Sequence, residues 1–600
     1  MRAPAQPTDL APAEPAGPRR HWRRWFLFAF LGVVVAFSAL CAIDLLRIKH
    51  ELDAGQDALA TLDLHSVDQH GGVGAVADRA ADHLDRAAQL AHHSRWLSLL
   101  DAVPVLGNQT RGVRDLTDAA ADVGGYARHA AAELQTALDA THGPEARISL
   151  LDKANAQLVE LRHELPTIDV GAKGFLLPPL SGARRQLVDR LAKAETQLDD
   201  GITLTRTLRS FLVGPRRYLV LGGNNGEMRG AGITTTAGIA TISNGRIDVN
   251  GFRPTGDLFL LDPHSAPVPA DLQNLYGWMA INKEWRTVDT SPNFPSIAPI
   301  YASMSEQSPL GAVDGVIFVD VVTLQNLVGV IGPVTVNGVT YTQANIADQL
   351  LHQNYLTFGT NDASVDRHDA QSEVASAIFQ AMNERAFSIP SVAAVLADAA
   401  KGRHLQAWAR DPAEQALWEK LGADGALNSK QLGVLATNVS ANKLDYFIDP
   451  KVSMTTSPLG ADHTRVQLRL SITNPRRNPK QTSPYIEGGS EGYVNPGDHR
   501  AYVLFYLPAA ATDIHNAQPG FSTSGTDGPE TVGGMIYIIP QGQTRTIEVD
   551  FTLPNDDATV ELLPSARLRP QRYTINGRAV TDAVPIDVDL EATGTVFTPQ

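Results

Sequence analysis

Three successive patterns of apolar positions divide the chain. From about residue 47 to 213, apolar side chains recur every three or four residues with few helix breakers, which is typical of amphipathic helices. From Pro215 onwards the apolar runs become short and β-branched, and they alternate with helical patterns to about residue 440. Beyond that an apolar–polar alternation of period two dominates. The patterns predict a multidomain chain: a helical stalk or bundle over 47–213, a central α/β domain over 214–440 and a C-terminal β-sandwich over 441–600.

The same patterns predict individual elements. About five helices are expected in the stalk, since Gly- and Pro-containing stretches punctuate it. In the α/β domain, strands are predicted over 218–222, 237–242, 258–261 and 313–320, and helices over 321–331, 343–356, 364–387, 390–402 and 411–421. In the sandwich, strands are predicted over 464–473, 501–507, 534–540, 545–552, 558–563, 571–576 and 584–590.

A stretch near the N-terminus has the length and composition of a membrane anchor. Residues 25–43 contain no charged side chain, and a helix of that length spans roughly the hydrocarbon core of a bilayer. Arginines cluster before it and Asp44 follows it, so the positive-inside rule places the N-terminus in the cytoplasm. We therefore predict a disordered cytoplasmic tail over 1–20, a single-pass anchor over 21–46, and an extracytoplasmic remainder.

The alternative to an anchor is a cleaved signal peptide. The apolar region of a signal peptide is usually shorter and ends in a small-x-small cleavage site. Here the apolar region is long and ends in Ser-Ala-Leu-Cys-Ala, which favours an uncleaved anchor that contacts the bilayer through residues 25–46.

Charge and cysteine content exclude several classes of protein. The formal net charge is −15, which argues against bulk attraction to nucleic acid, so no nucleic-acid partner is predicted. Cys41 is the only cysteine, so neither an internal disulfide nor a cysteine-ligated zinc cluster can form. The familiar signatures of serine hydrolases, zinc proteases and nucleotide-binding loops are absent as well.

The stretch LGGNNGEMRGAG, residues 221–232, is the strongest candidate for a binding site. It follows an apolar strand-like run, and a Gly-rich turn after a strand allows backbone N–H groups to converge on an anion. Asn224, Asn225 and Glu227 add hydrogen-bonding groups, and the Arg229 guanidinium suits a phosphate. The alternative is a wide turn in which Glu227 and Arg229 pair at the surface.

A second concentration of polar residues lies at 361–382, where a helix is predicted to begin. Arg367 is unfavourable near the positive end of a helix, which indicates another partner for its guanidinium. A salt bridge to Asp362 or Asp369 is the simpler interpretation, and an anionic ligand is the other.

Four segments together resemble a known bacterial family. They read RYLVLGGNNGEMRGAG, VDTSPNFPSIA, VDGVIFVDVVTLQNLVGVIGPVTVNG and NVSANKLDYFI. In this order they resemble the domain of unknown function 4012, whose members are membrane-anchored surface proteins. The Asn-Asn-x-Glu-Met-Arg core carries most of the resemblance, although the Arg-Pro-Thr-Gly-Gly that often follows in the family reads Arg-Gly-Ala-Gly-Ile here.

That family in turn is distantly similar to the LytR-CpsA-Psr phosphotransferases. Those enzymes attach polyprenyl-pyrophosphate-linked glycopolymers to the cell wall outside the membrane. The likeness implies an anion cleft in which Arg229 and Arg367 match family arginines and Arg253 falls near a third. Three departures stand out: Ala370 replaces a second arginine, and the aspartates expected after Arg229 and Arg253 are missing. One of those aspartates would help to hold a metal.

Two functions follow as expectations. The first is a protein of the bacterial cell membrane that binds or transfers a polyprenyl-phosphate-linked glycan or cell-wall polymer, through Arg229, Arg253, Arg367, Asn224, Asn225 and Glu227. The second is a non-enzymatic envelope scaffold or interaction protein, in which the helical stalk serves oligomerisation. Catalytic residues are not assigned, enzymatic activity stays open, and Mg²⁺ is the one cofactor that the likeness leaves open.

Overall fold

The chain folds into two compact units. The first comprises residues 1–63, 69–133 and 158–199, and the second comprises residues 64–68, 134–157 and 200–600. The computed structural model describes residues 21–139, 143–171, 175–357, 364–489, 494–516, 520–555, 559–590 and 596–599, without the side chains of 21–34, 357, 364–371, 596 and 599.

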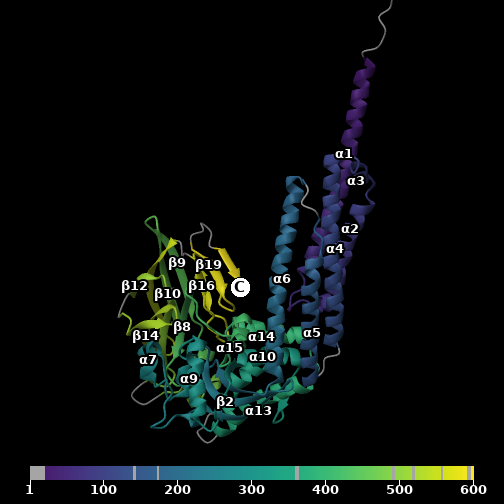
Figure 1. The fold of residues 1–600 in the computed structure, drawn as a ribbon. Helices are drawn as coiled ribbons and strands as arrows, with labels where there is room; N and C mark the ends of the chain where they lie inside the picture. The colour runs from purple at the N-terminus through teal and green to yellow at the C-terminus, as the bar shows by residue number, and fades with distance from the viewer. Residues whose placement is uncertain are drawn as a thin grey trace, which may run out of the picture. The chain divides into compact units, whose positions relative to one another are not determined.

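Helices build the first unit (Figure 1). Ala87 and Ala91 are fully buried and pack with Ile48, Leu97 and Val113, and such small side chains allow the helix axes to approach closely. The stalk that the sequence predicts is therefore confirmed as a set of N-terminal helices. The helices from the N-terminus to the first strand are α1 (His21–Leu59), η1 (Asp68–His70), α2 (Gly72–His93), α3 (Arg95–Leu100), α4 (Pro104–Asp139), α5 (Pro144–Glu164), η2 (Leu165–Thr167) and α6 (Pro178–Val213).

The predicted membrane anchor falls within α1. Among the described residues, no helix is both long and apolar enough to cross a bilayer. The tail over 1–20 lies outside the described residues, and so do the anchor's side chains up to residue 34. The anchor therefore stays a prediction.

A five-stranded mixed sheet organises the start of the second unit. Its order is β3-β2-β1-β4-β7, with β1 parallel to β4 and the other pairs antiparallel. Alternate residues of β1 enter different cores, Leu219 and Leu221 on one face and Tyr218 and Val220 on the other. Both faces are thus covered, which explains the continuous apolar run in this strand. The strands are β1 (Arg216–Asn224), β2 (Ile233–Ser243), β3 (Arg246–Pro254), β4 (Gly315–Asp320) and β7 (Leu405–Ala409).

Helices and short connections surround this sheet. α10 begins where the Asp320 carboxylate accepts a hydrogen bond from Thr323 N (3.0 Å) and ends before Gly332, whose φ is +87°, so both limits agree with the sequence pattern. The other elements are η3 (Thr255–Leu258), α7 (Ala270–Tyr276), η4 (Gly277–Met279), α8 (Trp285–Val288), α9 (Phe294–Glu306), α10 (Val321–Ile331), β5 (Val334–Val336), β6 (Val339–Tyr341), α11 (Ile346–Asp348), η5 (Gln349–Gln353), α12 (Asn354–Thr357), α13 (Ser364–Glu384), α14 (Ile389–Lys401) and α15 (Pro412–Lys420).

The strand predicted over 258–261 is wrong. Leu258 and Leu260 are buried and Phe259 and Leu261 are exposed, so the alternation is real, but the segment pairs with none of the described strands. Instead, Leu260 N donates to the Lys283 carbonyl (3.0 Å). Burial of alternate residues against a loop thus produced the same pattern as a sheet.

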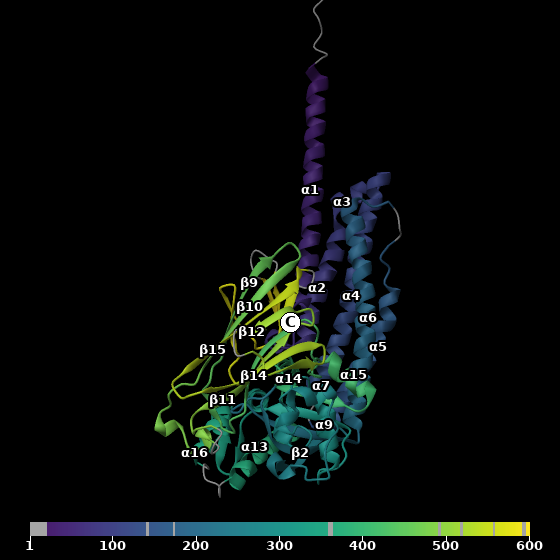
Figure 2. The same cartoon turned by 90° about the vertical axis from the view of Figure 1, so that its left-hand side faces the viewer.

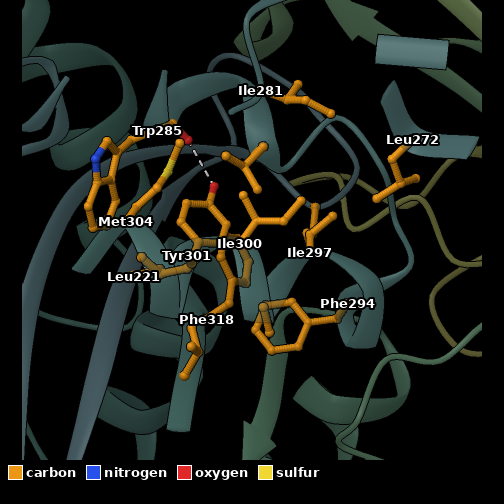
Figure 3. Packing of buried hydrophobic residues seen from close by; sticks show 14 of the residues in the cluster. Leu221, Leu272, Ile281, Trp285, Phe294, Ile297, Ile300, Tyr301, Met304 and Phe318 are labelled. Carbon is orange, nitrogen blue, oxygen red and sulfur yellow. Dashed lines mark hydrogen bonds between the residues drawn. The ribbon is translucent and has the colours of Figure 1, made fainter. Parts of the chain in front are cut away.

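The core on one face of the sheet is rich in aromatic side chains. Trp285 and Tyr301 lie with their ring centroids 5.8 Å apart, and the Tyr301 hydroxyl donates to the Trp285 carbonyl (2.9 Å) (Figure 3). Phe294, Ile297 and Ile300 of α9 fill the adjoining space (Figure 3). This core packs α8 and α9 against β1 and β2, the strands before and after the Gly-rich stretch.

Replacing Ile300 by valine is expected to lower the free energy of unfolding by about 1 kcal/mol, since Ile300 is 1% exposed and its lost methylene leaves a small cavity. Hydrogen exchange of peptides from α9 measures this loss. Ile538→Val is the matched control, because Ile538 is 50% exposed and should change stability by less than about 0.5 kcal/mol. Equal effects at both positions would show that the side chain of Ile300 is not closely packed.

Two sheets that share one core form the C-terminal region. Their orders are β12-β15-β10-β9-β17-β18 and β13-β14-β11-β8-β16-β19-β20, and Figure 2 shows β9, β10 and β15 side by side. β8 precedes the predicted boundary at 440 yet pairs with β11. The elements are β8 (Gln431–Asn438), η7 (Leu444–Tyr446), β9 (Lys451–Leu459), β10 (His463–Thr473), η8 (Pro479–Gln481), α16 (Pro484–Glu487), β11 (His499–Leu507), β12 (Thr512–Asn516), β13 (Thr523–Asp527), β14 (Glu530–Ile539), β15 (Thr544–Pro554), β16 (Thr559–Leu562), β17 (Arg572–Ile575), β18 (Arg578–Thr581), β19 (Ile586–Asp589) and β20 (Val596–Pro599).

Candidate functional site

The Gly-rich stretch forms a buried connection between β1 and β2. Asn224 shapes it, because its side-chain oxygen accepts from Gly226 N (2.9 Å) and its amide donates to the Tyr355 hydroxyl (2.7 Å). Asn225 donates to the Asp320 carboxylate (2.7 Å) and to the Ala566 carbonyl (2.9 Å). Both asparagines are almost completely buried, so they hold the backbone in place and present nothing to solvent.

Close packing explains two of the glycines. A Cβ on Gly223 would lie 2.3 Å from the Phe318 ring, and one on Gly230 would lie 2.7 Å from the Ser291 carbonyl oxygen. Gly230 N also donates to the Asp289 carbonyl (2.6 Å). The glycines allow this stretch to pass between neighbouring segments.

The buried Asp289 side chain binds the backbone at the start of β2, directly after the Gly-rich stretch. Its carboxylate accepts from Thr234 N (2.5 Å), and the side chain is 3% exposed. Burial raises the pKa of Asp289 to about 7, and the nearby Arg229 guanidinium and the Thr234 bond offset that burial only in part.

Glu227 lies between two cations. Its carboxylate accepts from Arg229 (3.2 Å) and from the Lys443 ammonium (2.7 Å), and each of the three side chains is at most 7% exposed. Burial opposes the charge on Lys443, but Glu227 holds the pKa of this ammonium above its ordinary value. Glu227, Arg229 and Lys443 form a buried triad with two positive charges and one negative charge, so its net charge is +1.

The backbone of the same stretch contacts the sandwich. Met228 N donates to the Asp445 carboxylate (3.1 Å), and Asn438 N donates to the Met228 carbonyl (2.8 Å). Asp445 also pairs with the buried Arg567 (2.5 Å). Burial alone would raise the pKa of Asp445, but Arg567 and its hydrogen-bond donors hold it below its ordinary value. The stretch therefore joins the five-stranded sheet to the sandwich.

A polar cavity of about 730 Å³ opens beside the triad. This volume lies within the range of small-molecule sites. Its charged lining has four cations and three anions, which leaves one net positive charge. The charged residues are Arg229, Arg253, Arg286, Lys443, Glu227, Asp257 and Glu284, and Phe252 and Tyr485 supply aromatic surface.

The cations in this lining differ in how they are held. All three guanidinium nitrogens of Arg229 donate, to the Glu227 carboxylate and to the carbonyls of Met228 and Arg286. Arg286 forms a two-pronged pair with Glu284 (2.8 and 2.7 Å). Arg253 is exposed on β3 and has no ion-pair partner among the described residues. Among the described residues, its guanidinium is therefore the one in this lining that is held by no carboxylate.

The residues predicted for the site are only partly brought together. Arg229, Arg253 and Glu227 line the cavity, whereas Asn224 and Asn225 are buried behind it. The Arg367 side chain lies outside the described residues. The sequence interpretation missed the other polar and aromatic lining residues, among them Arg286, Glu284, Lys443 and Tyr485. Only Lys443 carried a signal, since it lies within the family-like segment NVSANKLDYFI.

The cavity does not fit Mg²⁺, the metal left open above. Mg²⁺ prefers carboxylate and other oxygen ligands, but Glu227 and Glu284 are already paired with cations, and Asp257 lines the cavity as the third carboxylate. Within the described stretches, no group of three or more His, Cys, Asp or Glu side chains is placed to hold a metal. We therefore assign no step to a metal ion.

The comparisons with known proteins place one segment in a family. No curated protein gives a significant match, and neither does any solved structure. Residues 213–355 match the model of the family described as "Protein of unknown function (DUF4012)". The matched segment contains β1, the Gly-rich stretch and Arg253, but not Lys443. The segment that provides most of the cavity is therefore similar to the DUF4012 family.

Proposed function

We propose that the protein binds the anionic head group of a polyprenyl-phosphate-linked glycan or cell-wall polymer, on the outer side of a bacterial cell membrane to which it is anchored once. The observation that carries the proposal is the cationic excess in the 730 Å³ cavity, together with the unpaired Arg253 at its edge. A guanidinium with free donors is suited to bind phosphate oxygens through paired hydrogen bonds.

The two adjoining cavities have little space for the apolar part of such a ligand. Thr235 and Phe252 line both the polar cavity and a smaller apolar cavity of about 50 Å³, which holds about one or two water-sized groups. The proposal is therefore limited to the head group, and the isoprenoid chain is expected to remain outside this unit. Transfer of the glycan is not part of the proposal, because no side chain in the lining is assigned as its catalyst.

The affinity for geranyl pyrophosphate tests the proposal. Arg253→Ala in the full-length chain in detergent should weaken binding by about 10- to 100-fold, as expected when a charge-assisted hydrogen bond is lost. Isothermal titration calorimetry measures the change, with geraniol as the uncharged ligand that should not bind. Arg246→Ala is the control, because Arg246 lies on the same strand but pairs with Asp248 and is not part of the cavity.

The second candidate, a non-enzymatic scaffold, is favoured by a different observation. Glu227, Asn224 and Asn225 all bind groups inside the protein: Glu227 and Asn225 bind Lys443 and Ala566, which follow β8 and β16, and Asn224 binds Tyr355 of α12. If geranyl pyrophosphate does not bind, or if Arg253→Ala leaves its affinity unchanged, the scaffold becomes the better explanation and head-group binding is lost.

A further inference from the structure

Apolar side chains are exposed together at one end of the helical unit. Trp96 and Leu99 of α3 are 37% and 60% exposed, Val103 before α4 is 42% exposed, and Val105 and Leu106 in its first turn are 55% and 37% exposed. Single exposed apolar residues are ordinary on protein surfaces, but a contiguous group marks a contact surface.

A second segment adds to this end of the unit. Phe175 and Leu177, which precede α6, are 66% and 43% exposed. The Gln109 side chain holds them beside α4, since it donates to the Phe175 carbonyl (3.0 Å) and accepts from Leu177 N (2.8 Å). We call the exposed residues of α3, the α3–α4 junction and 175–177 the apolar end.

The apolar end lies level with the last turns of the uncharged stretch in α1. The rings of Phe37 and Trp96 meet edge to face with centroids 6.1 Å apart. The Ser94 hydroxyl, which also caps α3, donates to the carboxylate of Asp44 (2.6 Å), the first charged residue after the uncharged stretch. In Figures 1 and 2, α1 continues past the end of the unit at which α3 lies.

We propose that the apolar end docks on the outer surface of the lipid bilayer, with Leu99, Val105 and Phe175 in the acyl boundary and Trp96 at the level of the head groups. The proposal rests on the membrane anchor predicted over 25–43, because α1 then carries the apolar end to the water–lipid interface. Tryptophan favours that interface, and shallow insertion of apolar side chains beside basic ones is how surface-bound segments hold to lipid. Arg95 and Arg111 are exposed beside the apolar end and supply those charges.

Spin labels on the full-length chain in vesicles test this placement. Cysteine is introduced by Leu99→Cys or Val105→Cys in a Cys41→Ala background, which removes the only native thiol. The nitroxide's collisions with oxygen, which concentrates in lipid, are compared with its collisions with a water-soluble nickel chelate. In vesicles of phosphatidylethanolamine with phosphatidylglycerol, the ratio of oxygen collisions to nickel collisions should be several-fold higher at both positions than at a site exposed to water.

One control lies on the same helix and another on the anchor. Glu133→Cys labels an exposed position of α4 about 42 Å from Val105 along the helix axis, and it should remain accessible to the nickel chelate. Val35→Cys labels the predicted anchor, where the side chain is 61% exposed, and it should report lipid. These readouts are independent of geranyl pyrophosphate binding, so the two proposals can fail separately.

Three outcomes would overturn the docking. If the label at Leu99 or Val105 is as accessible to nickel as the label at Glu133, while the label at Val35 reports lipid, the apolar end lies in water. A label at Val35 that reports water would remove the anchor and the docking together. Strong dipolar broadening between labels at Leu99 would show that a second copy of the chain covers this surface in place of lipid.

Discussion

Replacing Glu227 by glutamine is expected to lower the free energy of unfolding of the second unit by about 3–5 kcal/mol. Glu227 is the shared anion of two buried cations, Arg229 and Lys443. The amide keeps the shape of the side chain but leaves both cations buried without a counterion, and burial of an unpaired charge costs far more than a surface ion pair contributes. Hydrogen exchange of peptides from β1 and β2 measures the loss.

An exposed pair gives the matched control. Glu548 of β15 pairs with Arg469 on the neighbouring strand β10, and both side chains are about half exposed or more, so Glu548→Gln should cost less than about 1 kcal/mol. The double variant Glu227→Gln/Lys443→Met should recover part of the loss, because it removes one of the two unpaired cations. A loss at Glu227 no larger than that at Glu548 would mean that water reaches the triad and screens it.

Local signals in the sequence predicted much of the central fold. The helix over 321–331 has the predicted limits, because its capping aspartate and terminal glycine are both local. β3 and β7 were missed: they are the edge strands of the sheet, and β3 has no run of consecutive apolar residues. An edge strand needs a partner on one side only, so its sequence is under less constraint to be apolar.

The candidate site was less predictable than the fold. Composition brought Arg229 to attention and the family likeness brought Arg253, and both line one cavity. Lys443 follows Glu227 by more than two hundred residues, and no spacing rule links positions that tertiary packing brings together. The glycines suggested an open anion-binding turn, whereas at Gly223 and Gly230 they allow close packing. Sequence composition identifies a special backbone, but only the structure shows what that backbone contacts.

Replacing Asp289 by asparagine is expected to change how stability depends on pH. The pKa of Asp289 is about 7 in the folded protein and about 4 in an unfolded chain, so between these values the folded state holds a proton that the unfolded state has released. The free energy of unfolding therefore falls as pH rises from about 4 to about 7, and it stays lowered above that range. The shift corresponds to about 4 kcal/mol.

Asparagine keeps an acceptor for Thr234 N but cannot ionise. Relative to the wild type, Asp289→Asn should therefore gain about 2–3 kcal/mol between about pH 5 and about pH 8, as measured by hydrogen exchange of peptides from β2 after correction for the intrinsic rate at each pH. Asp527 and Asp582 also have pKa values raised to about 6 by burial. Their contribution slopes in the same direction in both proteins, so the difference between the two proteins isolates Asp289.

The control for this experiment is Asp248→Asn, since Asp248 is a partly exposed residue of β3 that pairs with Arg246. Its effect should stay constant within about 0.5 kcal/mol over the same pH range. If Asp289→Asn were equally insensitive to pH, the carboxylate of Asp289 would have to be stabilised in its charged form, with Arg229 shared between Asp289 and Glu227. Arg229 would then carry no excess charge for a ligand, and Arg253 alone would be left to bind the head group.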